Sequence, residues 1–562
     1  MLADSVRSAM RLDTVGRNAR AAFGLVSLLA AACGEGAGRG GTIVIATAQD
    51  PDGLLPATYE TREARVVGEL LFDRLAERGP ALNTVGDVGF EPRLARRWEW
   101  SRDSLSVRFH LDPRARWHDG RPVRAGDVRF AFLLYTDPAV ASRLGGDLRE
   151  AMDSISVSDS LTCTAWFRTR TPEQFNTLVT TLAPLPEHLL GGVRRDSVRT
   201  SAFALAPVGS GPFRFVKWEP RQRLEIAAVE SFYRGRPVLD RVIWSYAPEM
   251  STLVQKLFAG EADFFDMVPP PSVPEAASHP DVRLLPRGNF DYSFLQLNLF
   301  DGPSERPHPL FADRALRRAL AMGLDRRALV RSLFDTLGHV LAGPFVRAQW
   351  SADTSLAQLP FDRAAAARTL DSLGWRVGPD GVRTRGGRPL AFRLLYPASS
   401  TNRKNMSVLI QEQLRGLGVR VELDGADNNA FVARGRARQY DAYFGGLIAT
   451  PSPSGIRQTW TSDAAKPGGF NTGRYLNTAF DAQVDSALNA RDVASAKAYY
   501  RAAYRIINED APAIWLYEPP QVAGAHRRLR TGPLRADAWW LDIPAWSIVP
   551  GTRLSRDSAA AP

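Results

Sequence analysis

The chain has 562 residues, of which 44% are hydrophobic and 23% are charged. This is an ordinary globular composition, with enough length for large cores and more than one domain. The formal net charge is +11, but the arginines are scattered and form no basic stripe interleaved with aromatic residues. Composition and charge therefore argue against a nucleic-acid partner.

The N-terminus predicts an export signal. Arginines precede the apolar run AAFGLVSLLAAA (21–32), which is too short to span a bilayer but has the length of a signal-peptide core. Cys33 follows, and then GEGAGRGG, so 33–40 is expected to be a flexible tether. The run resembles the bacterial lipoprotein signal, although Ala30 stands where leucine is usual. We expect a signal peptide over 1–32, a lipid anchor at Cys33 and an exported protein on the periplasmic or cell-surface side of a membrane. An ordinary secretion signal is the alternative.

The first half of the mature chain mixes strands with helices. A short β-branched strand is predicted over 42–46 and a helix over 61–75. Strict alternation over 105–111 predicts a half-buried strand, and a helix is expected from Ala125. The tryptophan, histidine and aspartate of WHDG (117–120) lie between these two elements in a turn, where such residues usually have a structural role.

The second half contains a strand–helix–strand unit. Hydrophobic residues alternate over 390–394 and again over 419–423, and Ile410, Leu414 and Leu417 share one face of the helix between them. Short connections make this a right-handed parallel crossover. Before this unit, in the first half of the chain, a further strand is predicted over 241–246. The pattern indicates α/β lobes.

No catalytic signature accompanies these elements. The sequence has no phosphate-binding P-loop, zinc-protease motif, paired-cysteine motif or nucleophile elbow. One G-x-G-x-x-G match, at Gly36, Gly38 and Gly41, precedes the first strand instead of following it, so we reject dinucleotide binding. With seven histidines and none in i, i+4 pairs, we expect no metal site, no cofactor and no enzymatic activity.

Five blocks of the sequence resemble the extracellular solute-binding proteins of the oligopeptide- and dipeptide-binding family (family 5), in the order in which that family has them. Together they cover about residues 41–548. The blocks are LARRWEWSRDSLSVRFHLDPRARWHDGRPVRAGDVRFAF; PVGSGPFRFVKWEP; LQLNLFDGPSERPHPLFADRALRRALAMGLDRRALV; LDSLGWRVGPDG with GRPL; and WTSDAAKPGGFNTGRYLNTAFDAQVDSA.

The resemblance implies a periplasmic-binding-protein-like α/β fold, with two lobes joined by hinge strands and an extra inserted domain. Carried onto this chain, lobe I would contain 41–85, 205–295 and 516–548, the inserted domain 86–204, and lobe II 296–515. Residues 549–562 would form a disordered tail. WHDG then falls in the inserted domain, so we interpret it as a structural corner.

The family function implies the substrate-binding subunit of an ABC importer, a monomer that closes on a peptide or peptide-like solute and presents it to a membrane permease. In peptide-binding members an aspartate on a lobe II loop, shortly after a tryptophan, holds the ligand's ammonium. Counting from Asp441, these positions fall on Leu447 and Thr450. A buried ammonium without a counter-charge costs roughly 3–5 kcal/mol. Either the ligand has no free ammonium at this place, which we favour, or Asp463 or Asp50 substitutes.

Other ligand-binding candidates flank that loop: Phe444, Trp460, Asn471 and Arg474. An aromatic ring and an arginine could hold an apolar group and a carboxylate. Alternatively Phe444 and Trp460 belong to the lobe core and Arg474 pairs with a nearby acid. Asn298 is expected on a crossing strand, with hydrogen bonds on the hinge side. A ligand sensor, a peptide chaperone or an exported hydrolase stays open as an alternative function.

Overall fold

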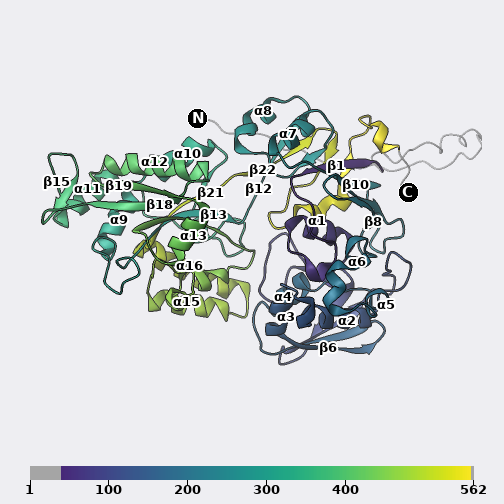
Figure 1. Cartoon of the computed structure of the whole chain (residues 1–562). Helices are drawn as coiled ribbons and strands as arrows, with labels where there is room; N and C mark the ends of the chain where they lie inside the picture. Colours follow the sequence, from purple (N-terminus) through teal and green to yellow (C-terminus); the bar gives the residue numbers. More distant parts are fainter. Residues whose placement is uncertain (1–39, 559–562) are drawn as a thin grey trace, which may run out of the picture.

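The computed structural model describes residues 40–558, and the signal peptide and Cys33 lie outside the described residues. Two bodies stand side by side (Figure 1): lobe I with the inserted domain, and lobe II. One continuous hydrophobic core joins lobe I to the inserted domain, whereas lobe II has its own clusters. The predicted fold class, two α/β lobes with an inserted domain, is confirmed.

Lobe I is built on a seven-stranded mixed sheet. The predicted strand over 241–246 is β10, which pairs in parallel with the N-terminal strand β1. Helix α1 begins after Thr61, whose hydroxyl accepts from the amide of Ala64 and caps the helix. In sheet order the strands are β12 (Val282–Arg287), β22 (Gln521–His526), β11 (Phe264–Phe265), β1 (Thr42–Thr47), β10 (Arg241–Tyr246), β9 (Arg223–Ala228) and β8 (Phe213–Glu219). The helices are α1 (Arg62–Leu71), α6 (Ala202–Leu205), α7 (Met250–Phe258) and α8 (Val273–Ser278).

The inserted domain has a four-stranded antiparallel sheet covered by helices. Its strands are β4 (Ala95–Trp100), β5 (Ser106–Leu111), β7 (Thr162–Phe167) and β6 (Met152–Asp159), and its helices are α2 (Ala125–Thr136), α3 (Gly145–Ala151), α4 (Gln174–Thr181) and α5 (Glu187–Leu190). A two-stranded sheet of β2 (Ala76–Arg78) and β3 (Phe90–Pro92) leads into it.

The corner WHDG ties the inserted domain to lobe I. The amide of Gly209 donates to His118 Nδ1 over 3.1 Å, and His118 Nε2 lies 3.1 Å from the carbonyl oxygen of Gly211. Burial lowers the pKa of His118 to about 4, so its imidazole is neutral at pH 7. Trp117 is buried, and its indole donates to Asp127. The interpretation of this stretch as a structural corner is therefore confirmed.

Lobe II is a six-stranded sheet flanked by helices. Strands β18 and β19 run parallel with α12 between them, as the strand–helix–strand pattern predicts. In sheet order the strands are β14 (His339–Val340), β21 (Ala513–Glu518), β13 (Asp291–Leu297), β20 (Ala442–Ile448), β18 (Ala391–Pro397) and β19 (Arg420–Ala426). The helices are α9 (Arg314–Gly323), α10 (Arg326–Phe334), α11 (Arg363–Ser372), α12 (Thr401–Arg415), α13 (Asn428–Arg436), α14 (Gly455–Trp460), α15 (Thr478–Leu488) and α16 (Val493–Asp510). A small sheet contains β15 (Arg376–Val377), β16 (Arg383–Arg385) and β17 (Arg388–Pro389).

The chain crosses between the lobes twice, and the two crossings lie together. Strand β12 of lobe I leads into β13 of lobe II through residues 288–290, and β21 returns to β22 through 519–520. Asn289 fastens the crossings: its amide nitrogen donates to the carbonyl of Pro519 over 2.6 Å, and its side-chain oxygen accepts from the amide of Asp291. These two short segments form the hinge.

The hinge differs in place from the sequence expectation. Residues 291–295 and 516–518 belong to the lobe II sheet, not to lobe I. Asn298 follows the crossing strand β13 as expected, but it lies at the end away from the hinge. There its amide donates to the carbonyl of Tyr440 inside lobe II, so the expected hinge-side hydrogen bonding is wrong.

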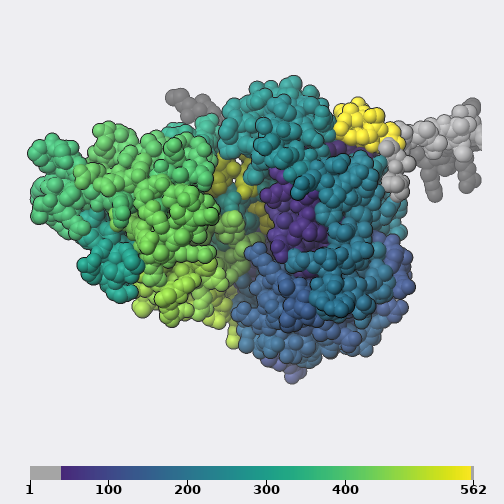
Figure 2. Space-filling view, in the orientation of Figure 1, coloured from purple at the N-terminus to yellow at the C-terminus, as the bar shows by residue number. Residues whose placement is uncertain are grey.

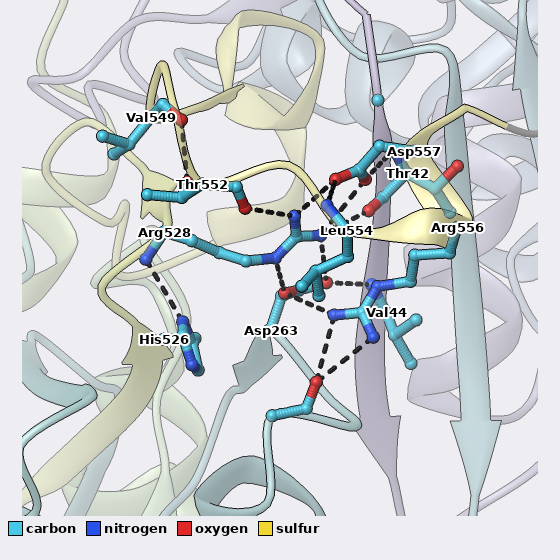
Figure 3. Close-up of polar contacts among 12 residues, drawn as sticks. Thr42, Val44, Asp263, His526, Arg528, Val549, Thr552, Leu554, Arg556 and Asp557 are labelled. Carbon is cyan, nitrogen blue, oxygen red and sulfur yellow. Dashed lines mark hydrogen bonds and ion pairs between the residues drawn. The ribbon is translucent and has the colours of Figure 1, made fainter.

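The C-terminal segment is folded up to residue 558, contrary to the expectation of a disordered tail from 549. Strands β23 (Leu529–Arg530) and β24 (Ser547–Ile548) pair just before it. Figure 3 shows how Arg528 holds the segment: its guanidinium donates to Asp263 over 2.6 Å and to Asp557 over 2.7 Å. Asp557 in turn accepts from the amide of Thr42 on β1. Buried ion pairs therefore clamp the end of the chain onto its first strand.

Candidate functional site

A hollow separates the two bodies (Figure 2), and the hinge crosses one end of it. Two adjoining pockets on the lobe II wall share Tyr292, Leu447 and Ile448, at the ends of β13 and β20. The two strands are antiparallel, so the start of β13 and the end of β20 lie next to each other at the same end of the sheet. Ligand sites commonly lie at such boundaries between domains. We take these two pockets as the candidate ligand-binding site.

The first pocket, which we name the neutral pocket, has a volume of about 280 Å³ and no charged residue among those that line it. Ile448 and Phe470 are 82% and 58% exposed, so this wall presents apolar surface that a ligand could cover. The other walls of the neutral pocket are the loop after β20 and helix α14. The lining residues are Tyr292, Pro344, Gln349, Leu447, Ile448, Ala449, Thr450, Ser452, Pro453, Gly455, Ile456, Gln458, Thr459, Phe470 and Tyr504.

The second pocket, the charged pocket, has a volume of about 450 Å³ and contains one acid and one arginine, Asp291 and Arg403. Arg403 sits in the first turn of α12, which Ser400 caps. Its guanidinium lies against Gly446, where an added Cβ would have to displace it. Among residues 40–558 this guanidinium has no hydrogen-bond acceptor. The other lining residues are Tyr292, Ser293, Ser400, Asn402, Gly446, Leu447, Ile448, Tyr517 and Pro519.

The negative charge of Asp291 is only partly compensated by its neighbours. Burial raises the pKa of its carboxyl group, against the hydrogen bond from Gln521 and the positive charges of Arg287, Arg403 and Arg62. Of the cations, Arg62 pairs with Asp266 over 2.5 Å. Burial lowers the pKa of Arg287 to about 10, and its Nε has no hydrogen-bond partner in the described residues. The hinge end of the cleft can therefore hold polar ligand groups of either sign.

Of the predicted ligand residues, Leu447 and Thr450 line the neutral pocket together. The hydroxyl of Thr450 donates to the carbonyl oxygen of Ser452 over 3.0 Å, which fixes the loop. The two substitute carboxylates lie elsewhere: Asp463 is exposed and pairs with Lys466, and Asp50 accepts from the amide of Arg221. Neither Asp463 nor Asp50 lines either pocket.

The other four candidates belong to the interior of lobe II. Phe444 is fully buried in the sheet core, and Trp460 packs edge-on against Trp515. Asn471 is also fully buried, and its amide donates to three backbone carbonyls. Arg474 donates to the carbonyls of Gly302 and Ser304, lies 4.2 Å from the ring centre of Phe300 and pairs with Glu305. The structural alternative, lobe core or a paired arginine, therefore describes Phe444, Trp460 and Arg474, and Asn471 is likewise buried inside lobe II. Within the described residues the indole nitrogen of Trp460 and Nε of Arg474 have no hydrogen-bond partner, but both atoms are buried.

The comparisons with known proteins place the chain in a family. The family model described as bacterial extracellular solute-binding proteins, family 5 (middle), matches residues 89–468, well over half of the chain. The chain belongs to this family. This solute-binding protein is 24% identical over 519 residues to the oligopeptide-binding protein AppA of Bacillus subtilis, covering 90% of this chain and 92% of the relative.

Other members are similar at comparable distance. Heme-binding protein A of Haemophilus influenzae is 25% identical, with 84% of this chain and 86% of that protein covered. The structure of the substrate-binding protein CtaP from Listeria monocytogenes superposes with a TM-score of 0.76 at 20% identity, covering 91% of this chain and all of that chain. At this identity the structural likeness establishes the fold.

Sequence reasoning missed the residues that give the site its chemistry. Asp291 and Arg403 are far apart in sequence, and neither belongs to a recognisable motif. Ile448 ends a strand pattern in which an exposed position cannot be told from a buried one. The weak signal that could have found Arg403 is its place in the first turn of a helix that follows a strand of a parallel pair.

The described residues contain neither a candidate metal cluster nor a candidate membrane span. In residues 40–558 no three acidic, cysteine or histidine side chains are grouped in a way that could hold a metal ion. Within the same range, no helix is both long and apolar enough to cross a bilayer.

Proposed function

We propose that this solute-binding protein is the substrate-binding subunit of an ABC importer, which captures a peptide or peptide-like solute between its lobes and delivers it to a membrane permease. The observation that carries this proposal is the arrangement of two lobes joined through a short double hinge beside two pockets on one cleft wall. Relatives named as ABC transporter peptide-binding proteins, and a neighbour solved in complex with a nonapeptide, support it.

A lipid anchor at Cys33 fits this role, because the binding protein would stay near its permease after export. Stable attachment needs more than one acyl chain. Mass spectrometry of membrane-extracted protein tests the anchor: the N-terminal peptide should begin at Cys33 and carry the mass of the acyl groups. An unmodified N-terminus at another residue would support the ordinary secretion signal instead.

Native mass spectrometry of the purified protein tests the capture function. We expect a fraction of the molecules to retain a small solute, released without chemical change when the protein is unfolded. A preparation that never carries a solute, and a peptide mixture that never binds in calorimetry, would contradict the proposal. Conversion of added peptides into products would favour the hydrolase alternative, and an unchanged uptake rate after deletion of a neighbouring permease would favour a sensor.

We infer further that the ligand places an uncharged, largely apolar group beside Thr450, and its polar end beside Arg403 and Asp291. The neutral pocket offers no carboxylate to an ammonium, and a buried ammonium without a counter-charge is costly. Arg403 offers two parallel donors that suit a carboxylate.

Synthetic tetrapeptides with free and with N-acetylated amino termini test this assignment. Acetylation should leave the affinity of the natural protein within about threefold, whereas Thr450→Asp should raise the affinity for the free-amine peptides by at least about tenfold. Asn429→Asp, at an exposed position of helix α13 that lines neither pocket, serves as a control for added charge. A strong preference of the natural protein for the free amine would overturn the assignment.

A further inference from the structure

The two bodies also touch away from the hinge, where a segment of lobe I reaches lobe II. Leu82 belongs to the same hydrophobic cluster as Tyr292 and Tyr504, and Val85 packs with Ala490 and Ala496. The hydroxyl of Thr84, next to these residues, accepts from the indole of Trp350 of lobe II over 2.9 Å. A polar group of the inserted domain completes this contact.

That group is the carboxylate of Glu173, the residue before α4 in the inserted domain, whose side chain makes no capping hydrogen bond to the helix. Its Oε1 accepts from the hydroxyl of Thr84 over 2.5 Å. Both its oxygens lie within 2.8 Å of the hydroxyl of Ser452, which belongs to lobe II. The carboxylate therefore bridges Thr84 on its own side and Ser452 on the other side of the boundary between the two bodies.

Ser452 belongs to the loop that lines the neutral pocket. Its carbonyl oxygen accepts from the hydroxyl of Thr450, and the side-chain amide of Gln349 donates to the carbonyls of both residues. The hydroxyl of Ser452 also accepts from the amide of Ser454. A displacement of Ser452 would therefore move Thr450, which also lines the neutral pocket.

Glu173 makes this bridge without an ion-pair partner in the described residues. The facing charged and titratable groups are Arg78 from β2, whose guanidinium is engaged with Asn176 and Asp537, and Tyr500 from α16. Burial raises the pKa of Glu173, and the hydrogen bonds from Ser452 and Thr84 and the charge of Arg78 only partly oppose this effect. An ionised carboxylate here is held by two neutral hydroxyls alone.

We propose that Glu173 is a positioning residue for ligand binding, which holds the loop 449–454 from across the lobe boundary and grips it more tightly when it is protonated. This inference rests on the proposed function. In the ionised state, separation of the bodies returns the charge to water, which favours opening. In the protonated state the carboxylic acid donates to the Ser452 hydroxyl, and separation of the bodies no longer gains the hydration of a charge. The contact is therefore stronger at lower pH.

The contact is measured first without any ligand. The protein is labelled with 5-fluorotryptophan, and the ¹⁹F resonance of Trp350 is assigned with Trp350→Phe. We expect this resonance to shift with pH through one transition above pH 4.5, in the natural protein and in the control Glu187→Gln, which removes an exposed acid of the same domain. In Glu173→Gln, which keeps the shape but not the charge, the transition should be absent. A transition that persists in Glu173→Gln, or that is missing from the natural protein, would overturn the proposal.

Ligand binding is measured second, with the N-acetylated tetrapeptides described above. Affinity of the natural protein should rise by roughly threefold to tenfold as pH falls through the transition, and Glu173→Gln should hold the higher affinity at every pH. Ser452→Ala should bind more weakly than the natural protein by a similar factor. A pH-independent affinity in the natural protein would refute the positioning role. If no tetrapeptide binds at all, the proposed function fails, while the ¹⁹F titration still decides whether the contact exists.

Discussion

The clamp at Arg528 offers a direct test of how the chain ends are held. Its guanidinium is 2% exposed and contacts two fully buried carboxylate groups, those of Asp263 and Asp557. A third bond, of 2.9 Å, goes to the carbonyl of Thr42. In Arg528→Met the side-chain volume is nearly kept, but Asp557 loses its cation. Because removal of one partner leaves a buried charge uncompensated, we expect the free energy of unfolding to fall by about 3–5 kcal/mol.

The effect should be strongest where the clamp acts. Hydrogen exchange of the β1 amides reports the local stability, and guanidinium denaturation reports that of lobe I. We expect exchange of β1 to accelerate by about 10²–10³ or more in Arg528→Met, and to stay unchanged in Arg530→Met, an exposed arginine of the same segment. Equal exchange rates in the two variants would refute the reasoning, because the ion pairs would then not stabilise β1.

The pH dependence of the clamp follows from Asp557. The pKa of this carboxyl group is lowered in the folded protein, against the effect of burial, by hydrogen bonds from Arg528 and from the amides of Leu554 and Thr42. A group with a lowered folded pKa stabilises the protein above its unfolded pKa and loses that contribution as pH falls. The clamp should therefore be complete above about pH 5 and weaken through pH 4 and below.

Three further predictions concern other parts of the fold. The folded pKa of His118 is about 4, below the ordinary 6.5, so the free energy of unfolding should fall by about 3 kcal/mol as pH drops from 6.5 to 4. A pH series of denaturation curves should show this loss, and His118→Gln should lack most of it. Trp460→Ala should lower the free energy of unfolding by about 3–5 kcal/mol. Phe444→Leu should lower the melting temperature and leave tetrapeptide affinity within twofold. A large change in affinity would show that Phe444 contributes to ligand binding. Asn289→Ala removes the fastening between the two crossings, so the distribution of inter-lobe distances from spin labels should broaden, and an unchanged distribution would show that the hinge is fixed by other contacts.

Much of the fold could be predicted because its signals are local. The strand over 241–246 and the β18–α12–β19 crossover follow from residue periodicity. The lobe boundary was misplaced because β13 and β21 are buried along nearly their whole length. Nothing in their composition marks which of two sheets they join.

The site was harder to predict because its contacts are non-local. Counting along one loop led to Leu447 and Thr450, which both line the neutral pocket. The same approach could not tell that Phe444 points into the core, since both faces of β20 are covered. Glu173 and Ser452 are 279 residues apart, and the segment after 549 is polar and yet folded through one buried ion-pair network. Such contacts leave no periodic pattern in a sequence.

The central claim is that two lobes close on a solute about the hinge at 288–290 and 519–520. Small-angle X-ray scattering of the full exported chain, with and without a tetrapeptide found to bind by calorimetry, tests it most directly. The account predicts a smaller radius of gyration in the bound state, by more than the experimental error, in the natural protein and in Arg530→Met alike. Identical scattering curves at saturating peptide would contradict it.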